Sequence, residues 1–343
     1  MKTKKLLALL LIFLTGLFMG TNVSASEADF FKGKTITFVC PHPPGGGYDR
    51  IVRSLALPFQ EMLGAQVIVK NIPAAVGIRA ANMVYKAKPD GLTIALLPGT
   101  ALILGAIEKL EGVAYDFPKY SFIGRVTAEP KVIFTKPKGK INNLDDIMNS
   151  SQPVTFGFQG SSDDAFVFMT GIKYAMNIPM ELVVGYRGTS AIELAVMSGE
   201  VDASFGAAGS RYPKIHAGDL KALAIFGTEN PPEPEYRNLP ILPGKYKYVP
   251  GGEEVMQAML DINETHRVVA GPRGMSEKRR QFLEDMLYKT LNDPKLKKQW
   301  EKEGRVIKFL SGKDYAKLAQ GIFGKLPQAL LDAWQTEKKK IKY

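Results

Sequence analysis

Four loops of the sequence combine glycines with hydroxyl, amide or cationic side chains, a composition suited to binding an anion. The first, residues 41–49, reads Pro-His-Pro-Pro-Gly-Gly-Gly-Tyr-Asp and leads into a helical pattern. Its glycines would let backbone N–H groups approach a ligand, and the helix would direct the positive end of its dipole to the same place. Tyr48 would then line a cleft. A plain tight turn in which Asp49 caps the helix explains the same residues, so spacing alone leaves both interpretations open.

The other three loops offer further groups for an anion. Residues 98–101 (Pro-Gly-Thr-Ala) follow a strand pattern. Residues 159–163 (Gln-Gly-Ser-Ser-Asp) enter a helix, where their hydroxyls and amides would either hold a carboxylate or cap the helix. Residues 185–190 (Gly-Tyr-Arg-Gly-Thr-Ser) also precede a helix, and Arg187 could present a bidentate guanidinium fork to a carboxylate. An ordinary solvated arginine is the alternative there.

Catalytic and metal-binding interpretations have much weaker support. Residues 33–35 (Gly-Lys-Thr) resemble the end of a Walker loop, but the upstream glycine is missing and the segment precedes a strand. His42, His216 and His266 are not at metal-ligand spacing. Cys40 and His42 would leave the same face of a strand, yet nothing in the sequence orients the histidine as a base. We therefore expect no catalytic residue, no metal site and no cofactor.

Alternating strand and helix patterns place the four loops at the carboxyl ends of strands, where open α/β sheets bind ligands. Residues 35–97 read strand–helix–strand–helix–strand with apolar strands, which predicts a parallel sheet covered by helices. The pattern resumes between residues 132 and 226. A last strand and three helices are then expected at residues 266–270, 277–291, 294–303 and 313–333.

This layout predicts a bilobed α/β protein with two parallel-rich sheets and flanking helices. Two crossing strands, near residues 131–136 and 222–227, would join the lobes and form a hinge that can close on a ligand. The expected divisions are a cleaved signal peptide (1–25), the N-terminal part of the first lobe (26–129), the second lobe (130–239) and the C-terminal part of the first lobe (240–343).

The first 25 residues have the pattern of a signal peptide. Lysines lie before an apolar run over residues 6–20, and Val-Ser-Ala at residues 23–25 has the small side chains that a signal peptidase requires. The apolar run is shorter than the roughly 20 residues that span a bilayer. We therefore expect export to the periplasm with cleavage after Ala25. Cys40 is the only cysteine, so no internal disulfide is expected.

The formal net charge is +11. Such a field would accelerate the approach of an anionic ligand, but a solvated surface rich in lysine is the favoured interpretation. The basic residues are spread along the chain with no stripe of basic and aromatic residues. Nucleic-acid binding is therefore not expected.

Residues 44–49 resemble the Pro-Gly-Gly-x-x-Asp opening of the solute receptors of tripartite tricarboxylate transporters, also called Bug-type proteins. Further segments resemble the same family in the same order along the chain. These segments are residues 63–71, 88–93, 185–188, 199–202, 217–224 and 270–334.

The resemblance implies a periplasmic-binding-protein-like (Venus-flytrap) fold without catalysis. Such a protein captures a small organic anion, with a carboxylate favoured, and delivers it to membrane permease subunits; a monomer is expected. Two alternatives remain, a ligand-sensing partner of a membrane sensor kinase and an enzyme on an α/β scaffold. Carried over position by position, the family's ligand contacts fall on Gly46, Gly47, Asp49, Thr100, Ser161, Ser162, Tyr186, Gly188 and Asp202, beside Tyr48 and Arg187 from the loops above.

The sequence departs from the family pattern at three places. Residues 71–77 read Asn-Ile-Pro-Ala-Ala-Val-Gly where the family has Asn-Arg-Pro-Gly-Ala-Gly-Gly. Gly206 stands where the family often has an acidic residue, and Tyr48 is bulkier than the usual threonine. These changes predict a pocket of altered size or polarity.

Overall fold

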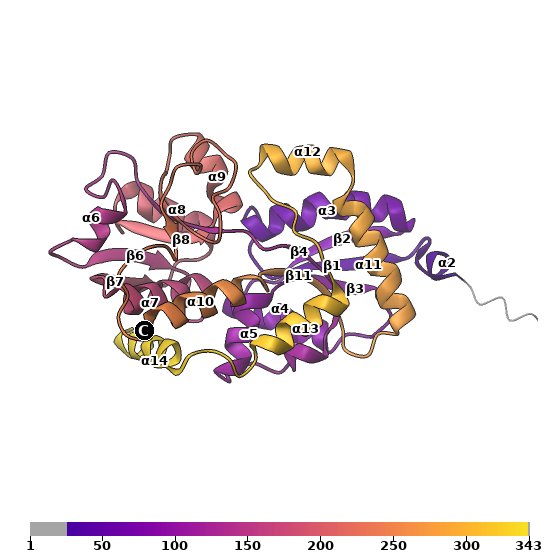
Figure 1. The fold of residues 1–343 in the computed structure, drawn as a ribbon. Coiled ribbons are helices and arrows are strands. Elements are labelled where there is room, and N and C mark those ends of the chain that lie inside the picture. The colour runs from indigo at the N-terminus through magenta and orange to yellow at the C-terminus, as the bar shows by residue number, and fades with distance from the viewer. Residues whose placement is uncertain (1–25, 342–343) are drawn as a thin grey trace, which may run out of the picture.

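The structure is a computed structural model that describes residues 26–341 and folds them into two lobes, each built on a six-stranded sheet (Figure 1). The signal peptide expected in residues 1–25 lies outside the described residues. The first sheet has the strand order β12 (Leu310–Ser311), β4 (Ser121–Thr127), β11 (Arg267–Gly271), β3 (Thr93–Pro98), β1 (Thr35–Cys40) and β2 (Gln66–Asn71). The second has the order β10 (Ile241–Leu242), β9 (Lys221–Phe226), β5 (Lys131–Thr135), β8 (Ala203–Ala207), β6 (Val154–Phe158) and β7 (Met180–Val184).

Helices cover both sheets. The first lobe carries α2 (Glu27–Phe31), α3 (Gly47–Leu63), α4 (Ile78–Tyr85), α5 (Gly99–Ile107), α11 (Glu277–Leu291), α12 (Pro294–Lys302) and α13 (Gly312–Ile322). The second lobe carries α6 (Leu144–Met148), α7 (Asp164–Met176), α8 (Thr189–Ser198) and α9 (Ala208–His216). Two further helices, α10 (Gly252–Asn263) and α14 (Gln328–Lys340), pack against α7.

The bilobed α/β class is confirmed, but the sheets are mixed rather than parallel-rich. Strands β1, β2 and β3 are parallel neighbours, as are β6, β7 and β8. By contrast, β11 runs antiparallel to β3 and β4, and β5 runs antiparallel to β8 and β9. The short edge strand β12 also runs antiparallel to its neighbour β4. Strands β5 and β11 are those that enter a sheet from the other lobe. Because they begin at the edge where their neighbours end, they have to run in the opposite direction.

The chain crosses between the lobes at residues 128–130, between β4 and β5, and returns at residues 264–266, between α10 and β11. It passes to the second lobe once more at residues 323–327, between α13 and α14. The first crossing lies next to the one that the sequence predicted. The second differs from the expected crossing at residues 222–227, because that segment forms β9 inside the second sheet. The proline-rich loop that follows β9 folds back and adds β10 as a parallel neighbour.

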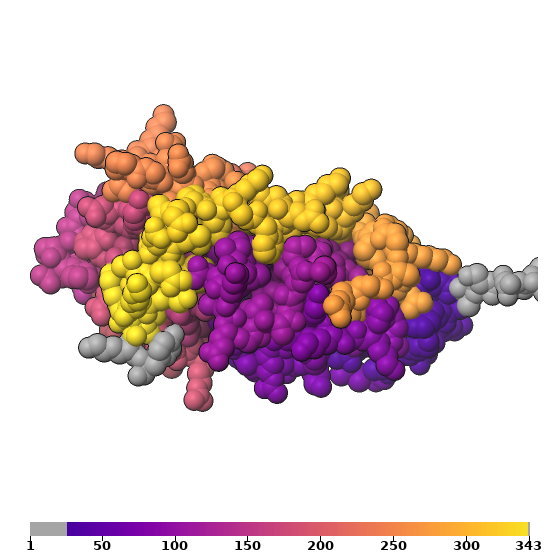
Figure 2. Space-filling model, turned by 90° about the horizontal axis from the view of Figure 1, so that it is seen from below, coloured from indigo at the N-terminus to yellow at the C-terminus, as the bar shows by residue number. Residues whose placement is uncertain are grey.

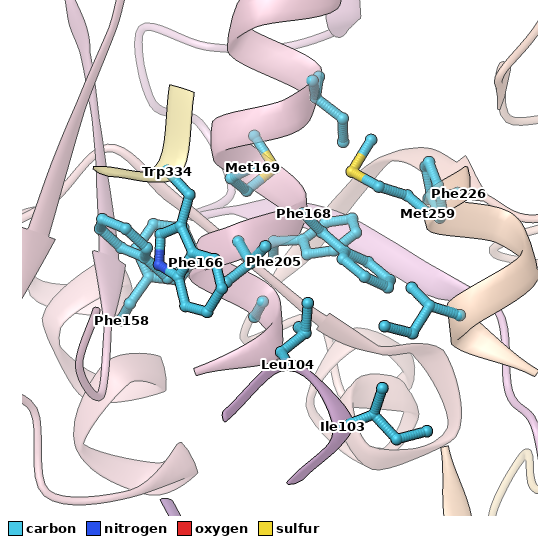
Figure 3. Close-up of a cluster of buried hydrophobic side chains, with 14 of the residues drawn as sticks. Ile103, Leu104, Phe158, Phe166, Phe168, Met169, Phe205, Phe226, Met259 and Trp334 are labelled. Carbon is cyan, nitrogen blue, oxygen red and sulfur yellow. The ribbon is translucent and has the colours of Figure 1, made fainter. Parts of the chain in front are cut away.

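One buried apolar cluster joins the two lobes on the side of α5, α7 and α10 (Figure 3). Ile103 and Leu104 from α5 of the first lobe belong to the same cluster as Phe166 and Phe168 from α7. All four side chains are fully buried. Exposing such a side chain costs about 1.5–3 kcal/mol, so an opening between the lobes has to occur on the opposite side.

Residues 313–333, expected as one helix, form parts of two helices, α13 and α14. The break falls at residues 323–327, where Gly324 has a φ of 78° and Pro327 stands directly before α14. The C-terminal segment, yellow in Figure 2, runs along one face of the molecule over both lobes. Within residues 240–343, which we expected in the first lobe, β10, α10 and α14 thus contact elements of the second lobe.

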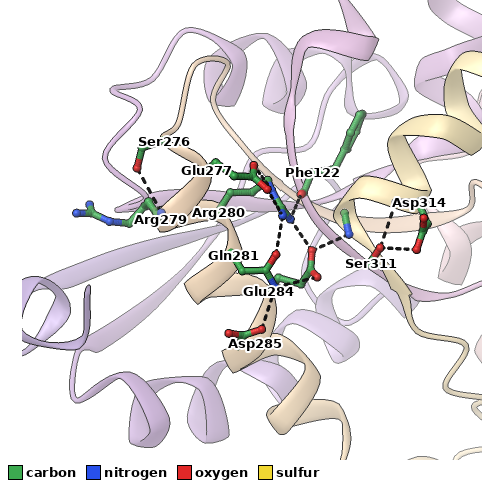
Figure 4. Close-up of polar contacts among 11 residues, drawn as sticks. Phe122, Ser276, Glu277, Arg279, Arg280, Gln281, Glu284, Asp285, Ser311 and Asp314 are labelled. Atoms are coloured by element: carbon green, nitrogen blue, oxygen red, sulfur yellow. Dashed lines mark hydrogen bonds and ion pairs between the residues drawn. The ribbon is translucent and has the colours of Figure 1, made fainter. Parts of the chain in front are cut away.

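A side-chain network around Arg280 fastens α11 to its neighbours in the first lobe (Figure 4). Arg280 donates to the carbonyl oxygen of Phe122 in β4 at 3.3 Å and forms an ion pair with Glu284. Glu284 in turn accepts a hydrogen bond of 2.9 Å from the backbone N–H of Gly312, the first residue of α13. The network therefore ties the C-terminal helices to the first sheet, which supplies one wall of the site described below.

Trp334 is the residue whose loss should test the docking of α14. Its side chain is fully buried, and its indole N–H donates to the carbonyl oxygen of Ser161 at 2.7 Å. We expect Trp334→Ala to lower the free energy of unfolding by about 3–5 kcal/mol, because a large cavity remains. Trp334→Phe should lose less, since it keeps most of the apolar volume. Urea unfolding measures both, and a loss below about 1 kcal/mol for the alanine variant would contradict this packing.

Candidate functional site

A cavity of about 160 Å³ lies between the lobes, at the edge where the parallel strands of both sheets end. The first lobe contributes the loop after β1, the end of β3 and the start of β11. The second lobe contributes the start of β5, the end of β8 and the first turns of α7, α8 and α9. All four loops singled out in the sequence supply residues to the wall of this cavity. The cavity thus lies at the ends of the strands, where α/β sheets bind ligands.

The glycine loop after β1 brings α3 against the second lobe. Gly46 is the extended N-cap residue of α3, and Gly47 begins the helix. A Cβ atom on Gly47 would lie 2.3 Å from Oγ of Ser210 in α9. Only glycine therefore allows this close approach between the two lobes beside the cavity.

Aromatic and imidazole rings form the floor of the cavity in the first lobe. The rings of His42 and Tyr48 have centroids 4.5 Å apart, and the ring of His266 lies 6.2 Å from that of Tyr48. The guanidinium carbon of Arg267 lies 4.9 Å from the Tyr48 ring centroid. Burial lowers the pKa of His42 to about 4 and that of His266 well below its usual value, so both rings are neutral near pH 7.

The two strands that enter a sheet from the other lobe each begin with a buried cation in the cavity wall. Lys131 opens β5 and pairs in register with Ala207 and Phe226, the last residues of β8 and β9. Arg267 opens β11 opposite Pro98, the last residue of β3. Their side chains are only 2% exposed.

Sequence reasoning missed both residues, together with His266, Asp164, Ser210 and Arg211 of the same wall. His42 and Asp163 lie in two of the loops that it singled out, but it did not name them as ligand contacts. A signal was present for two of them. Lys131 precedes Val-Ile-Phe and Arg267 precedes Val-Val-Ala, so each is a single charge at the start of an apolar strand. A buried charge needs a partner, which makes such a residue a candidate for a polar site.

Carboxylates compensate the buried cations. Lys131 Nζ lies 2.7 Å from Asp164 Oδ2, and Arg267 Nη1 lies 2.5 Å from Glu129 Oε1. Glu129 stands in the crossing segment between β4 and β5 and is 1% exposed. Removing one member of such a pair leaves an uncompensated charge, which costs about 3–5 kcal/mol.

Ser210 of the second lobe is bound by two arginines of the first. Arg267 Nη2 donates to Ser210 Oγ at 2.9 Å, and Arg50 Nη2 donates to the Ser210 carbonyl oxygen at 3.1 Å. These bonds and the contact at Gly47 require α3 and α9 to lie together. The structure therefore has the lobes in contact across the cavity.

An acidic pair from the first turn of α7 lies in the second-lobe wall. Burial and the neighbouring carboxylate of Asp164 raise the pKa of Asp163 to about 7. Burial also opposes the ionisation of Asp164, but Lys131 outweighs it and lowers the pKa of Asp164. The pair therefore holds one proton, on Asp163, below neutral pH.

Five of the residues expected to bind the ligand line the cavity: Gly46, Gly47, Tyr48, Arg187 and Gly188. Tyr186 lies in a neighbouring cavity that shares part of the same wall, and its hydroxyl donates to Glu200 Oε1 at 2.7 Å.

The other five expected residues line neither cavity. Asp49 accepts hydrogen bonds from the Gly45 N–H at 2.9 Å and from Asn71 at 2.8 Å, which fixes the shape of the glycine loop. Asp202 similarly accepts from the N–H and hydroxyl of Thr155. The remaining three are Thr100, Ser161 and Ser162. Thr100 donates to the carbonyl oxygen of Ile262, and the carbonyl of Ser161 accepts from Trp334.

The altered loop over residues 71–77 does take part in the wall, through Val76. Ala75, Val76 and Gly77 have φ values of 46°, 52° and 97°. A β-branched residue in this left-handed region is strained at a cost of order 1–3 kcal/mol. The loop therefore keeps a conformation suited to glycine while placing an isopropyl group at the cavity.

Two other chemistries find no support within residues 26–341. These residues contain no group of three or more His, Cys, Asp or Glu side chains that could hold a metal ion. Burial raises the pKa of the Cys40 thiol to about 11, and its Sγ donates to the His42 carbonyl oxygen at 3.6 Å. A thiol of that pKa is a poor nucleophile at neutral pH. Within residues 26–341, no helix has the length and apolar character needed to cross a bilayer.

Comparison with known proteins identifies a family model that matches residues 51–328, described as the tripartite tricarboxylate transporter family receptor. A UPF0065 protein of Bordetella pertussis is 30% identical over 207 residues, which cover 59% of this chain and 64% of the relative. The chain thus spans just under two thirds of that relative. Protein BugT of the same organism is 26% identical over 237 residues, covering 67% of this chain and 71% of BugT.

Solved structures show the same fold. A protein of R. palustris with adipate has a TM-score of 0.72 at 17% identity, covering 88% of this chain and 97% of its own. MatC from Rhodopseudomonas palustris with bound malate has a TM-score of 0.69 at 19% identity, covering 87% and 99%. The periplasmic binding protein BugD has a TM-score of 0.68 at 20% identity, covering 89% and 97%.

Asp163→Asn should separate the titration of the acidic pair from its structural role. The amide can still accept the capping hydrogen bond from the Ala165 N–H, but it binds no proton. The raised pKa means that folded wild type keeps a proton between pH 3.8 and about 7 that the unfolded chain releases. The stability of wild type relative to the variant should therefore fall as the pH rises through this window, by up to about 4 kcal/mol, and level off above it.

Urea unfolding at a series of pH values measures this difference. The exposed Asp145→Asn is the matched control for loss of a carboxylate. A difference between wild type and Asp163→Asn that stays constant with pH would contradict the shared proton.

Proposed function

The chain belongs to the family of tripartite tricarboxylate transporter receptors, and we propose that it captures a small organic anion, a carboxylate, between its lobes and delivers it to the permease subunits of such a transporter. The family consists of solute-binding receptors, not enzymes. Among the structural neighbours, one was solved with adipate and another with malate, which supports a carboxylate ligand here.

The observation that carries this proposal is the cavity between the lobes, with its glycine rim and its cations. The N-terminal end of α3 faces the cavity through Gly46 and Gly47, so backbone N–H groups and the helix dipole favour an anion there. Lys131, Arg211 and Arg267 place three cationic groups in the wall, each paired with one carboxylate. In a site removed from water, such charges attract a carboxylate more strongly than at the surface.

We assign direct ligand contact to the residues expected from sequence that line the cavity: Gly46, Gly47, Tyr48, Arg187 and Gly188. Tyr186 would act at the neighbouring opening. Asp49 and Asp202 would position the backbone of the loops, as their hydrogen bonds to Gly45 and Thr155 suggest. Thr100, Ser161 and Ser162 would support the wall.

Ligand capture would proceed by closure of the lobes about the crossing segments. In the closed arrangement Ser210 meets Gly47, Arg50 and Arg267, whereas separation of α3 from α9 would open a path to the cavity. The ligand shifts the equilibrium between the open and closed forms only if the closed form binds it more tightly than the open form does. Contacts to both walls provide that difference.

The site of action would be the periplasm, and the protein would work there as a monomer. Two structural neighbours are described as a periplasmic transporter and a periplasmic binding protein. The signal-peptide pattern of residues 1–25 agrees with export.

A panel of small carboxylic acids should identify the ligand class. We expect malate, adipate or a related acid to raise the thermal unfolding midpoint of the purified protein, while the neutral amides do not. At about one hundred times its dissociation constant, a ligand adds about 2.7 kcal/mol of stability. Protein freed of bound ligand by unfolding, dialysis and refolding serves as the control for ligand retained on purification. If no acid shifts the unfolding midpoint after this treatment, the proposal that the protein is a carboxylate receptor is excluded.

Gly47→Ala should impair closure. The added methyl group would meet Ser210 Oγ at 2.3 Å and Ser210 Cβ at 3.0 Å, so α3 and α9 could no longer approach. We expect titration calorimetry to show at least about a tenfold loss of affinity, equivalent to 1.4 kcal/mol, for any acid that binds wild type.

The matched control is Gly160→Ala on the facing lobe, where an added Cβ meets no atom within 4 Å. It should retain the affinity of wild type. Equal affinity for Gly47→Ala and wild type would show that contact between α3 and α9 is not part of ligand binding.

A further inference from the structure

Arg211 in α9 is a buried cation of the cavity wall whose hydrogen-bonding groups are only partly used. The residue is 5% exposed. Its Nη1 donates to Glu193 Oε1 at 3.1 Å, whereas its Nε has no hydrogen-bond partner. Among the described residues, none accepts a hydrogen bond from its Nη2. The edge of the guanidinium group formed by Nε and Nη2 is therefore left without an acceptor.

The position of this edge is set by Gly206 in β8. A Cβ atom at Gly206 would lie 2.7 Å from Arg211 Nη2 and 3.3 Å from Arg211 Nε. The backbone of Gly206 has no left-handed φ, so the strand itself would accept a larger residue. The guanidinium group occupies the space in which a side chain at residue 206 would lie, so glycine at this position allows Arg211 to pack against β8.

The other buried cations of the wall are bound more fully by the protein. Lys131 is held by Asp164 at 2.7 Å. Arg267 donates through Nη1 to Glu129 and through Nη2 to Ser210, so only its Nε lacks a partner and no edge has both nitrogens free. Arg187 is exposed. Arg211 thus combines burial, a place in the cavity wall and a complete unpaired edge.

We propose that Arg211 binds the carboxylate of the ligand directly, side-on through Nε and Nη2. This assignment rests on the proposed function and specifies it. A planar carboxylate matches the two parallel N–H groups of a guanidinium edge, and such bidentate pairs are among the strongest hydrogen-bonded contacts in proteins. Glu193 on the opposite nitrogen holds the group in place, so little ordering is needed when the ligand arrives.

The chemistry of this contact defines the ligand class. The group bound at α9 has to be a planar anion with two equivalent oxygens. The rest of the ligand would lie against the apolar wall residues Val76, Ala101 and Ile192 and the glycine rim. A neutral amide of the same shape has one oxygen and an NH₂ group, so it would place a donor against a donor.

Two variants test Arg211 without leaving Glu193 unpaired. Gly206→Ala keeps both charges but covers the free edge, and the end of the arginine side chain can shift to accept the methyl group. Arg211→Lys keeps a positive charge near Glu193 but removes the planar fork. Malate and adipate, together with the diamide of each, are titrated calorimetrically into wild type and variants, and urea unfolding reports the stability of each ligand-free protein.

We expect both variants to bind the acids at least about tenfold more weakly than wild type, with only a small change in stability. The exposed Arg237→Lys on the same lobe controls for the substitution and should bind as wild type does. Unchanged affinity in Gly206→Ala and Arg211→Lys would overturn the assignment, as would lower stability with unchanged affinity, which is the result for a purely structural arginine. If wild type binds neither acid and none of the panel, the proposed function itself fails, and the assignment fails with it.

Discussion

The ion pair between Glu129 and Arg267 is the interaction on which the arrangement of the two lobes depends. Glu129 lies in the segment that leaves the first sheet, and Arg267 is the first residue of the strand that returns to it. Both are almost completely buried, so each charge needs a nearby partner; the buried Arg305 also lies 3.7 Å from Glu129 Oε1. The pair therefore fastens the first two crossings to each other, and its Arg267 belongs to the cavity wall. Because Arg267 also donates to Ser210 of the second lobe, the same guanidinium group connects the hinge, the cavity wall and the contact between the lobes.

Around this pair, the fold divides the interface between the lobes into an apolar side and a polar side. The apolar side joins α5 to α7 through fully buried side chains and would be costly to separate. The polar side holds the cavity, and there the lobes meet through a few hydrogen bonds and through close contacts at Gly47, Gly209 and Gly304. Bonds of this kind contribute only about 0.5–1.5 kcal/mol each. A ligand that touches both walls can therefore supply enough free energy to favour the closed arrangement.

The sequence predicted most helices and strands closely, because their apolar periods and glycine or proline ends are local signals. Residues 277–291, for example, form a helix with the predicted bounds. The prediction missed α5, whose first seven residues are all buried, so it shows no alternation between an apolar and a polar face. It also joined α13 and α14 across Gly324 and Pro327, two residues that are common at helix ends. Of the expected ligand contacts, the glycine loop after β1 and Arg187 reached the cavity, whereas Asp49 and Asp202 turned inward to cap backbone groups.

By itself the sequence determined the α/β class, the family, and the set of glycine-rich loops at the carboxyl ends of the strands. These features depend on residues close together in the chain. Only the tertiary structure decided which charges face the cavity. Lys131 and Arg267 reach it because β5 and β11 begin at the edge where neighbouring strands end, in a register fixed by pairing with residues far along the chain. Arg211 reaches it because Gly206, in a neighbouring strand, has no side chain to exclude the guanidinium group. Periodicity along one segment cannot reveal such contacts, since they depend on how separate segments pack.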